Sequence, residues 1–160
     1  MATTLPSYIT WADADIYFGN RLHVTAWLGA TQAEKTVALV EATQRIERLR
    51  FSGYLVDADQ DLEFPRYYDE VEGSDGTEVV PDNIKYATCE LALALLDGAD
   101  PDMEYENLAT VNHGYGSAKI SSSGQDTIPH LVAGIPSVTA WRYLQQYLAP
   151  ARNVRIRRVS

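Results

Sequence analysis

Apolar residues recur three and four positions apart in several segments of the chain, which is the spacing of one face of an α-helix. Thr10, with an acid three positions later, is typical of a helix start, and we predict a short helix that ends near Gly19. The capping-box pattern of residues 31–34 predicts a longer helix that runs to about Arg50. Its predicted core stripe consists of Leu39, Ala42, Ile46 and Leu49.

A third helix is predicted over residues 81–98, and it is the most apolar of the set. Within residues 86–96 only Thr88 and Glu90 are polar. A helix that is apolar on nearly every side is buried on nearly every side, so we expect this one at the centre of the fold. Residues 136–150 predict a fourth helix, which one proline opens and another closes.

Two long segments, residues 51–80 and 107–135, lose the helical period and contain many turn-forming residues. Short strands are predicted around Leu62–Phe64 and Thr77–Val80, where they could pair as a hairpin, and Ser117–Ser121 is a further candidate strand. The pattern therefore predicts a mainly α protein. It would be a small bundle of about four helices around a central buried helix, with a small β insertion.

The last ten residues differ from the rest of the chain in charge. Residues 151–160 contain four arginines and no acid, whereas the whole chain has a net charge of -9. We therefore expect one helical domain, residues 1–150, followed by an extended basic C-terminal arm that docks on a partner. A frayed tail and direct contact with duplex DNA are the alternatives. The expected partner-binding residues are Arg152, Arg155, Ile156, Arg157 and Arg158.

Composition narrows the class of protein further. A chain of 160 residues with 46% hydrophobic and 22% charged residues is typical of one folded, soluble domain. No apolar run approaches the roughly 20 residues that span a bilayer, and the first residues resemble no export signal, so no membrane contact is expected. A pI near 4.7 argues against broad nucleic-acid binding, because most of the surface would repel phosphate. The objection does not apply to the arm, because the arm is basic.

Candidate metal and catalytic residues form no convincing site. Asp57, Asp59 and Asp61 are spaced like the first ligands of a calcium loop, but Leu62 replaces the turn glycine that such a loop needs. Cys89 is the single cysteine, which excludes an internal disulfide, and its place in the apolar helix predicts an inert core thiol. The three histidines, His23, His113 and His130, have no metal-type spacing with it. We expect no metal, no cofactor and no catalysis.

Ten tyrosines raise the hypothesis of base stacking on single-stranded nucleic acid. Stacking surfaces of that kind alternate aromatic with basic residues, whereas Tyr67 and Tyr68 are followed by Asp69 and Glu70. Packing in the core or in an interface is the predicted role of the tyrosines on helices. They are Tyr17, Tyr86, Tyr143 and Tyr147.

Five ordered segments resemble the head–tail connector (adaptor) proteins of tailed bacteriophages. An opening helix, a second helix, an acidic–aromatic–Pro-Arg stretch, a proline followed by an apolar helix, and a final helix end are similar to the elements of that family. The likeness covers roughly the first 98 residues well and the remainder loosely. The segments are Tyr8–Phe18, Ala38–Arg50, Asp59–Arg66, Val80–Ala92 and Tyr147–Pro150.

This resemblance implies a structural, non-enzymatic virion protein, made in the host cytoplasm and located at the head–tail interface. Family members form a dodecameric ring between the portal protein and the tail or nozzle proteins, and duplex DNA passes through the ring without specific binding. Their C-terminal segments dock on the portal, which is what we expect of the arm. Similar sequences are sometimes labelled DnaT-like single-strand DNA-binding proteins. The alternative function is therefore a single-stranded DNA-binding replication accessory protein.

Overall fold

The computed structural model describes residues 6–67, 79–110 and 128–150. The described chain is mainly helical and carries one small two-stranded sheet, which confirms the predicted fold class. The helices are α1 (Trp11–Phe18), α2 (Thr25–Gly29), α3 (Gln32–Ile46), α4 (Asp82–Leu96), α5 (Pro101–Thr110), α6 (Pro129–Val132) and α7 (Val138–Leu144), with a 3-10 turn over Gln145–Tyr147. The strands are β1 (Tyr54–Leu55) and β2 (Arg66–Tyr67).

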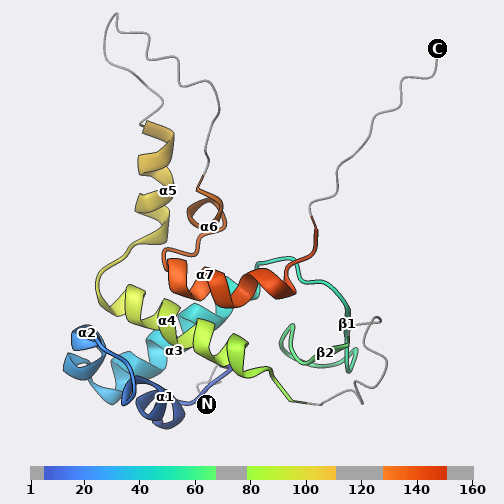
Figure 1. The fold of residues 1–160 in the computed structure, drawn as a ribbon, viewed down its shortest axis with the longest axis horizontal. Helices are drawn as coiled ribbons and strands as arrows, with labels where there is room; N and C mark the ends of the chain where they lie inside the picture. The colour runs from blue at the N-terminus through green and yellow to red at the C-terminus, as the bar shows by residue number, and fades with distance from the viewer. Residues whose placement is uncertain (1–5, 68–78, 111–127, 151–160) are drawn as a thin grey trace, which may run out of the picture.

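Helix α4 is the central helix of the fold, as its apolar sequence predicts. It packs against α3 and α7 and also contacts α1 and α2 (Figure 1). Cys89 and Leu91 in its middle are completely buried, and so is the polar Thr88, whose hydroxyl donates to the carbonyl of Ile84 one turn earlier. The Thr88 hydroxyl is therefore satisfied within the helix, and burying it leaves no polar group without a partner.

The two N-terminal helix starts form as the capping patterns predict. The Thr10 side chain accepts from the Asp13 amide at the start of α1, and Thr31 and Glu34 form a reciprocal capping box at the start of α3. Helix α3 ends at Ile46, four residues before the predicted end. The carboxylate of Glu47 accepts a hydrogen bond from the Glu63 amide, which ties the end of α3 to the β insertion.

Three helices are absent from the prediction: α2, α5 and α6. Helices of four or five residues are too short to show a 3.6-residue period, and α5 has a weak apolar face because its first turns are acidic. In α2, the indole of Trp27 is completely buried and donates to Asp15 Oδ1 at 2.7 Å. Helix α7 starts one residue after its N-cap, Ser137, and thus later than the predicted start.

The β insertion exists, but its strands differ from the predicted ones. Strands β1 and β2 pair antiparallel. The predicted strand over residues 62–64 is wrong: these described residues pair with no strand, and the Phe64 side chain lies in the core, with 2% of its surface exposed. Arg66 holds the insertion to the preceding loop by donating to the carbonyls of Ser52 and Gly53, each at 2.8 Å. Val79 and Val80 are not in a strand, and the rest of the second predicted strand lies outside the described residues.

Two further predictions also fall on residues that the structure does not describe. They are the candidate strand Ser117–Ser121 and the whole C-terminal arm, residues 151–160. Within the three described segments, no helix has the length and apolar character that a membrane crossing requires.

Candidate functional site

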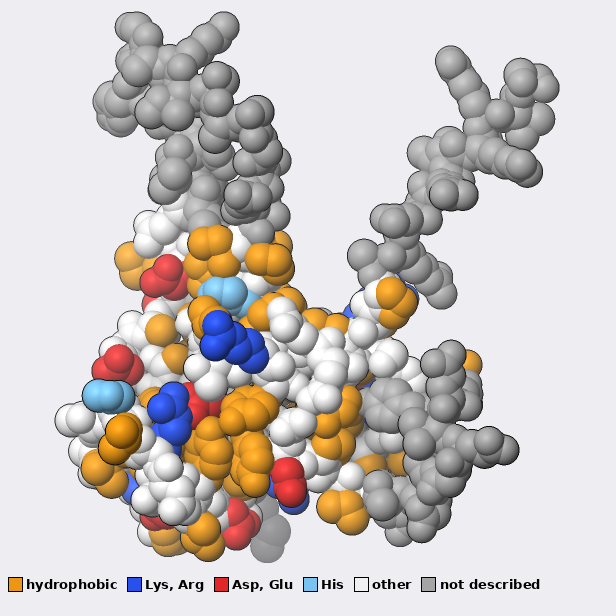
Figure 2. Space-filling view, in the orientation of Figure 1, with side chains coloured by type: hydrophobic (Ala, Val, Ile, Leu, Met, Phe, Trp, Pro, Cys, Tyr) orange, Lys and Arg blue, Asp and Glu red, His pale blue; other side chains and the backbone are white. Residues whose placement is uncertain are grey.

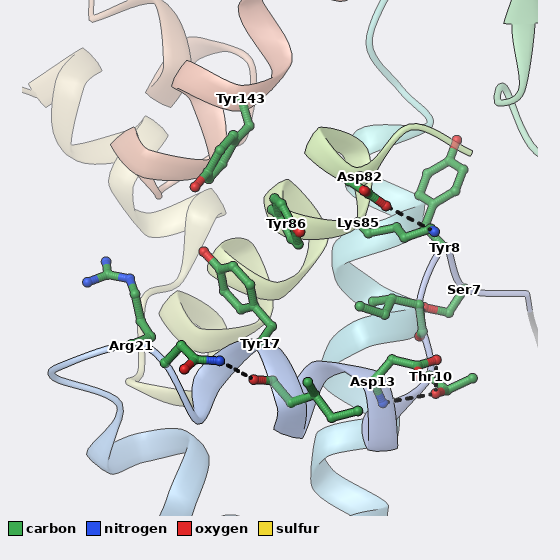
Figure 3. Close-up of a pocket in the computed structure, with 13 residues that line it drawn as sticks. Ser7, Tyr8, Thr10, Asp13, Tyr17, Arg21, Asp82, Lys85, Tyr86 and Tyr143 are labelled. Atoms are coloured by element: carbon green, nitrogen blue, oxygen red, sulfur yellow. Dashed lines mark hydrogen bonds and ion pairs between the residues drawn. The ribbon is translucent and has the colours of Figure 1, made fainter. Parts of the chain in front are cut away.

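A groove of about 800 Å³ lies beside the central helix. Its walls come from α1 and the segment before it, the first turns of α4, and α7 (Figure 3). Hydrophobic side chains gather in the middle of this face, between α1 and α4, and charged side chains lie at their margin (Figure 2). The groove thus combines apolar ring surface with a polar rim, which is the usual make-up of a ligand site.

Three tyrosines from three different helices form one side of the groove, and we call them the tyrosine ladder. Tyr17 of α1 stacks on Tyr86 of α4, with ring centroids 4.9 Å apart and an angle of 21° between the ring planes. Tyr86 in turn meets Tyr143 of α7 edge to face at 5.9 Å. All three rings are partly exposed along the groove (Figure 3). The ladder therefore lines the groove with three partly exposed aromatic rings.

Glu90 of α4 fixes one end of the ladder. Its carboxylate is only 4% exposed, and its Oε1 accepts from the Tyr17 hydroxyl at 2.7 Å and from Arg21 Nε at 2.8 Å. A second Arg21 nitrogen donates to Oε2 at 3.3 Å. The hydrogen bond and charge of Glu90 raise the pKa of Arg21, while burial, reinforced by Glu90, raises the pKa of Tyr17. Arg21 thus stays charged and Tyr17 stays a neutral donor.

The opposite end of the groove is polar. Lys85 Nζ lies 3.3 Å from Asp82 Oδ1, and both side chains are partly or largely exposed. Asp13 accepts from the Thr10 hydroxyl at 2.7 Å. Among the described lining residues the two cations, Arg21 and Lys85, each have a carboxylate as hydrogen-bond partner. The groove therefore has no surplus of positive charge.

A second hollow, of about 360 Å³, lies between α2, α4 and the start of α7. His23, Asp97 and Ser137 contribute to its lining, and no tyrosine, phenylalanine or tryptophan does. Glu90, which accepts from the ladder residue Tyr17, also lines this hollow. The hollow offers no ring on which a base could stack. The tyrosine-lined groove is therefore the better candidate for a binding site.

The described residues show no metal centre. No group of three or more histidine, cysteine or acidic side chains in those residues could hold a metal ion. Asp57, Asp59 and Asp61 are all exposed on their loop, and His113 lies outside the described residues. Cys89 is buried as predicted, and burial raises the pKa of its thiol to about 12. A thiol with that pKa is protonated at neutral pH and is a poor nucleophile.

The structure does not test the residues that the sequence singled out for partner binding. Arg152, Arg155, Ile156, Arg157 and Arg158 all lie outside the described residues, so their role stays a prediction.

What the structure brings together instead is Tyr17, Tyr86 and Tyr143, for which the sequence predicted only packing. They do pack, but they also line the groove. Sequence reasoning looked for aromatic and basic residues that alternate along the chain, whereas the ladder and Arg21 meet only because α1, α4 and α7 pack together. One signal was available: Tyr86 is the single aromatic residue of α4.

Comparison with known protein families gives one match. The family model described as "Putative DnaT-like ssDNA binding protein" matches residues 2–114, which is more than half of the chain. Tyr17, Arg21, Tyr86 and Glu90 lie within the matched residues, and Tyr143 lies beyond them. No curated protein and no solved structure matches the chain.

This match corrects the family assignment made from the sequence. The matching model is not a bacteriophage head–tail connector family, so the structural connector function and its portal, tail and nozzle partners are unsupported. The dodecameric ring, with duplex DNA passing through it unbound, is likewise unsupported. The virion localisation depended on the same resemblance and remains untested. Four of the five segments that suggested a connector fall inside the matched residues, and only Tyr147–Pro150 lies beyond them. The chain belongs to the DnaT-like ssDNA binding protein family.

Proposed function

We propose that this protein binds single-stranded DNA and that the tyrosine-lined groove is its binding site. The observation that carries the proposal is the tyrosine ladder, which exposes three rings from three helices along one groove. Family membership supports the class of ligand, and the ladder supports the mode of contact. This was the alternative function in the sequence analysis.

Base stacking is the main interaction in the proposed mechanism. Unpaired bases lie against the partly exposed rings of Tyr17, Tyr86 and Tyr143, and each stacked base contributes about 1–3 kcal/mol. The ladder is rigid before DNA arrives, because Tyr17 is held both by its stack on Tyr86 and by its hydrogen bond to Glu90. A ligand therefore meets rings that need little further ordering, which lowers the entropic cost of binding.

The mode of contact favours single strands over duplexes. Bases in a duplex are stacked on one another and paired, so their faces are not available to protein side chains. A single strand can separate its bases and place them on the ladder at little cost. We further propose that the protein acts by binding alone, without catalysing a reaction.

The test is a titration of a fluorescent oligothymidylate of about 12 nucleotides with the protein at low salt, followed by fluorescence anisotropy. Tyr86→Ala removes the middle ring and should weaken binding roughly tenfold or more. Tyr105→Ala removes a tyrosine that is 53% exposed on α5, outside the groove, and is the matched control. The function is refuted if the wild-type protein does not bind at roughly tens of micromolar, a concentration within the range of nonspecific dissociation constants. Equal affinity of the two variants would refute the site.

A further inference from the structure

An acidic protein that binds DNA poses an electrostatic problem. The chain carries a net charge of -9, and a DNA strand carries one negative charge per nucleotide. Single-strand binding proteins ordinarily overcome this repulsion with a positively charged groove. Here the groove cations are Arg21 and Lys85, and each is paired with a carboxylate in the described structure. The arrangement at Arg21 suggests how the groove binds DNA without that surplus of charge.

We propose that Glu90 is a positioning residue that keeps Arg21 from DNA phosphates, so that the groove recognises the faces of unpaired bases rather than the sugar–phosphate backbone. This inference rests on the proposed function and adds the part of the ligand that is recognised. It predicts that the groove contributes little to the salt dependence of binding, because few counter-ions are released when no phosphate is neutralised.

The geometry explains why a phosphate does not displace Glu90. Two Arg21 nitrogens already donate to the two carboxylate oxygens, at 2.8 and 3.3 Å. Glu90 is 4% exposed whereas Arg21 is 37% exposed, so the carboxylate cannot turn into water when it loses its partner. A phosphate that recruited Arg21 would leave a buried charge without a counter-ion, which is strongly unfavourable. Arg21 therefore stays with Glu90 when DNA binds.

Lys85, the second cation of the groove, differs from Arg21 in the burial of its partner. Lys85 is 30% exposed, and its partner Asp82 is 72% exposed, at the longer distance of 3.3 Å. An exposed pair of this kind is weak and can open without burying an unpaired charge. Lys85 can therefore leave its partner for a phosphate, whereas Arg21 stays bonded to Glu90. The two cations have the same formal charge but differ in availability because only one of their partners is buried.

The same Glu90 carboxylate orients the ring that begins the ladder. Its Oε1 receives the Tyr17 hydroxyl at 2.7 Å as well as Arg21 Nε, so one buried group holds both an aromatic ring and a cation in place. Glutamine at this position can still accept from the Tyr17 hydroxyl but has no charge to hold Arg21. Substituting glutamine for Glu90 therefore separates the two roles.

The experiment compares Glu90→Gln with Glu41→Gln in the oligothymidylate titration, repeated over a range of salt concentrations. Glu41 pairs with Arg45 on α3 at 3.0 Å, outside the groove, so its variant makes the same change of charge at another Glu–Arg pair. Both variants are full-length, and the arginines of residues 151–160 are common to both. Any difference between the two variants therefore reports on the groove.

We expect Glu90→Gln to bind roughly fivefold more tightly at low salt, with a logarithmic salt slope steeper by about 0.7, the value for one additional phosphate contact on a single strand. Glu41→Gln should show neither change. The double variant Arg21→Gln/Glu90→Gln should return to the wild-type slope. A Glu90→Gln variant that matches Glu41→Gln, or that binds more weakly than wild type, overturns the inference but leaves the proposed function intact. Failure of the wild-type protein to bind overturns both.

A measurement on the wild-type protein covers the case in which Glu90→Gln does not fold. The Nε–H of Arg21, observed by ¹⁵N-edited NMR, should keep its protection from solvent exchange when the oligonucleotide is added, because its bond to Glu90 persists. Loss of that protection on saturation with DNA would mean that Arg21 leaves Glu90 for a phosphate, and the inference would be wrong.

Discussion

The molecule has two aromatic clusters that contain similar rings and differ in what those rings can touch. In the tyrosine ladder, Tyr17 and Tyr86 stack with their planes 21° apart and remain partly exposed. In the second cluster, which we call the closed cluster, the rings meet edge to face at angles of 73–81°. Three of its four rings are buried, whereas all three ladder rings are partly exposed. The closed cluster consists of Tyr8, Phe51, Phe64 and Tyr147.

The surrounding backbone explains the difference. The closed cluster lies where two distant parts of the chain are joined, since the amide of Ser52 donates to the carbonyl of Tyr147 at 2.8 Å and the amide of Ala149 donates to the carbonyl of Arg50 at 2.9 Å. No such backbone bonds are found between α1, α4 and α7 in the described residues, whose contact is through side chains. The number of aromatic residues therefore says little about binding; how exposed they are decides it.

The largest expected effect concerns the closed cluster. Phe64→Ala removes a ring that is 2% exposed and touches three other rings, so it should lower the free energy of unfolding by about 3–5 kcal/mol. Urea denaturation followed by circular dichroism measures this. Val37→Ala, at a side chain 65% exposed on α3, is the control and should cost less than about 1 kcal/mol. A similar loss for the two variants would contradict the description of a closed, stabilising cluster.

In the ladder, a substitution is expected to affect DNA binding more than folding stability. Tyr143→Ala should cost about 1–3 kcal/mol in the free energy of binding to single-stranded DNA, because one stacking surface is lost. Its effect on unfolding should be smaller than that of Phe64→Ala, since Tyr143 is only partly buried. Anisotropy titration and urea denaturation of the same preparation give both values. A variant that loses stability but keeps full DNA affinity would show that Tyr143 belongs to the core rather than to the site.

A smaller effect is expected when only the hydroxyl at the end of the ladder is removed. Tyr17→Phe keeps the ring but deletes the hydrogen bond to Glu90, which leaves Arg21 as the carboxylate's remaining side-chain donor in the described residues. The free energy of unfolding should fall by about 1 kcal/mol, as is usual for one such bond. Thermal unfolding by differential scanning calorimetry can resolve this change. An unchanged melting temperature would indicate that the Tyr17 hydroxyl does not help to hold the ladder.

The smallest expected effect is a pH dependence confined to the closed cluster. Glu47 accepts from the Tyr8 hydroxyl and the Glu63 amide, and burial raises the pKa of its carboxyl above the usual 4.5. The native state therefore binds this proton more tightly than the unfolded state does. Stability from this group is fully present below about pH 4.5 and is lost as the pH rises through the raised native pKa.

The loss should be less than about 1 kcal/mol, because the carboxyl is only half-buried and solvent screens it. Glu47→Gln removes the titrating group, and urea denaturation at several pH values between pH 4.5 and neutrality measures the effect. The free energy of unfolding of the variant should fall less over that range than that of the wild type. Parallel curves for the two proteins would exclude Glu47 as the source of the pH dependence.

Much of the helical architecture follows from local patterns in the sequence. The cap at Thr10, the capping box at Thr31 and Glu34, and the apolar run of residues 86–96 each act through neighbours within one or two turns. For that reason the starts of α1 and α3 and the central position of α4 are predictable. Helices α2 and α6 and strands β1 and β2 are not, because none is long enough to show a period, and α5 is not, because its apolar face is weak.

The candidate site could not be predicted in the same way. The sequence shows ten tyrosines and an acidic chain, and both facts are correct. Whether a tyrosine stacks within a core or lines a groove depends on which helices lie next to one another, and Tyr17, Tyr86 and Tyr143 are separated by more than fifty residues at each step. The availability of a cation likewise depends on the burial of its partner, as the difference between Arg21 and Lys85 illustrates.

The sequence by itself determined a mainly helical protein with a buried central helix, because helix periodicity and capping are interactions between residues close together in the chain. Only the tertiary structure decided that three distant tyrosines form one exposed ladder, that four other aromatic residues close on themselves, and that Arg21 is held by a buried carboxylate. The physical reason is that exposure, ring stacking and charge pairing are properties of surfaces made by several elements together, and no single segment contains them.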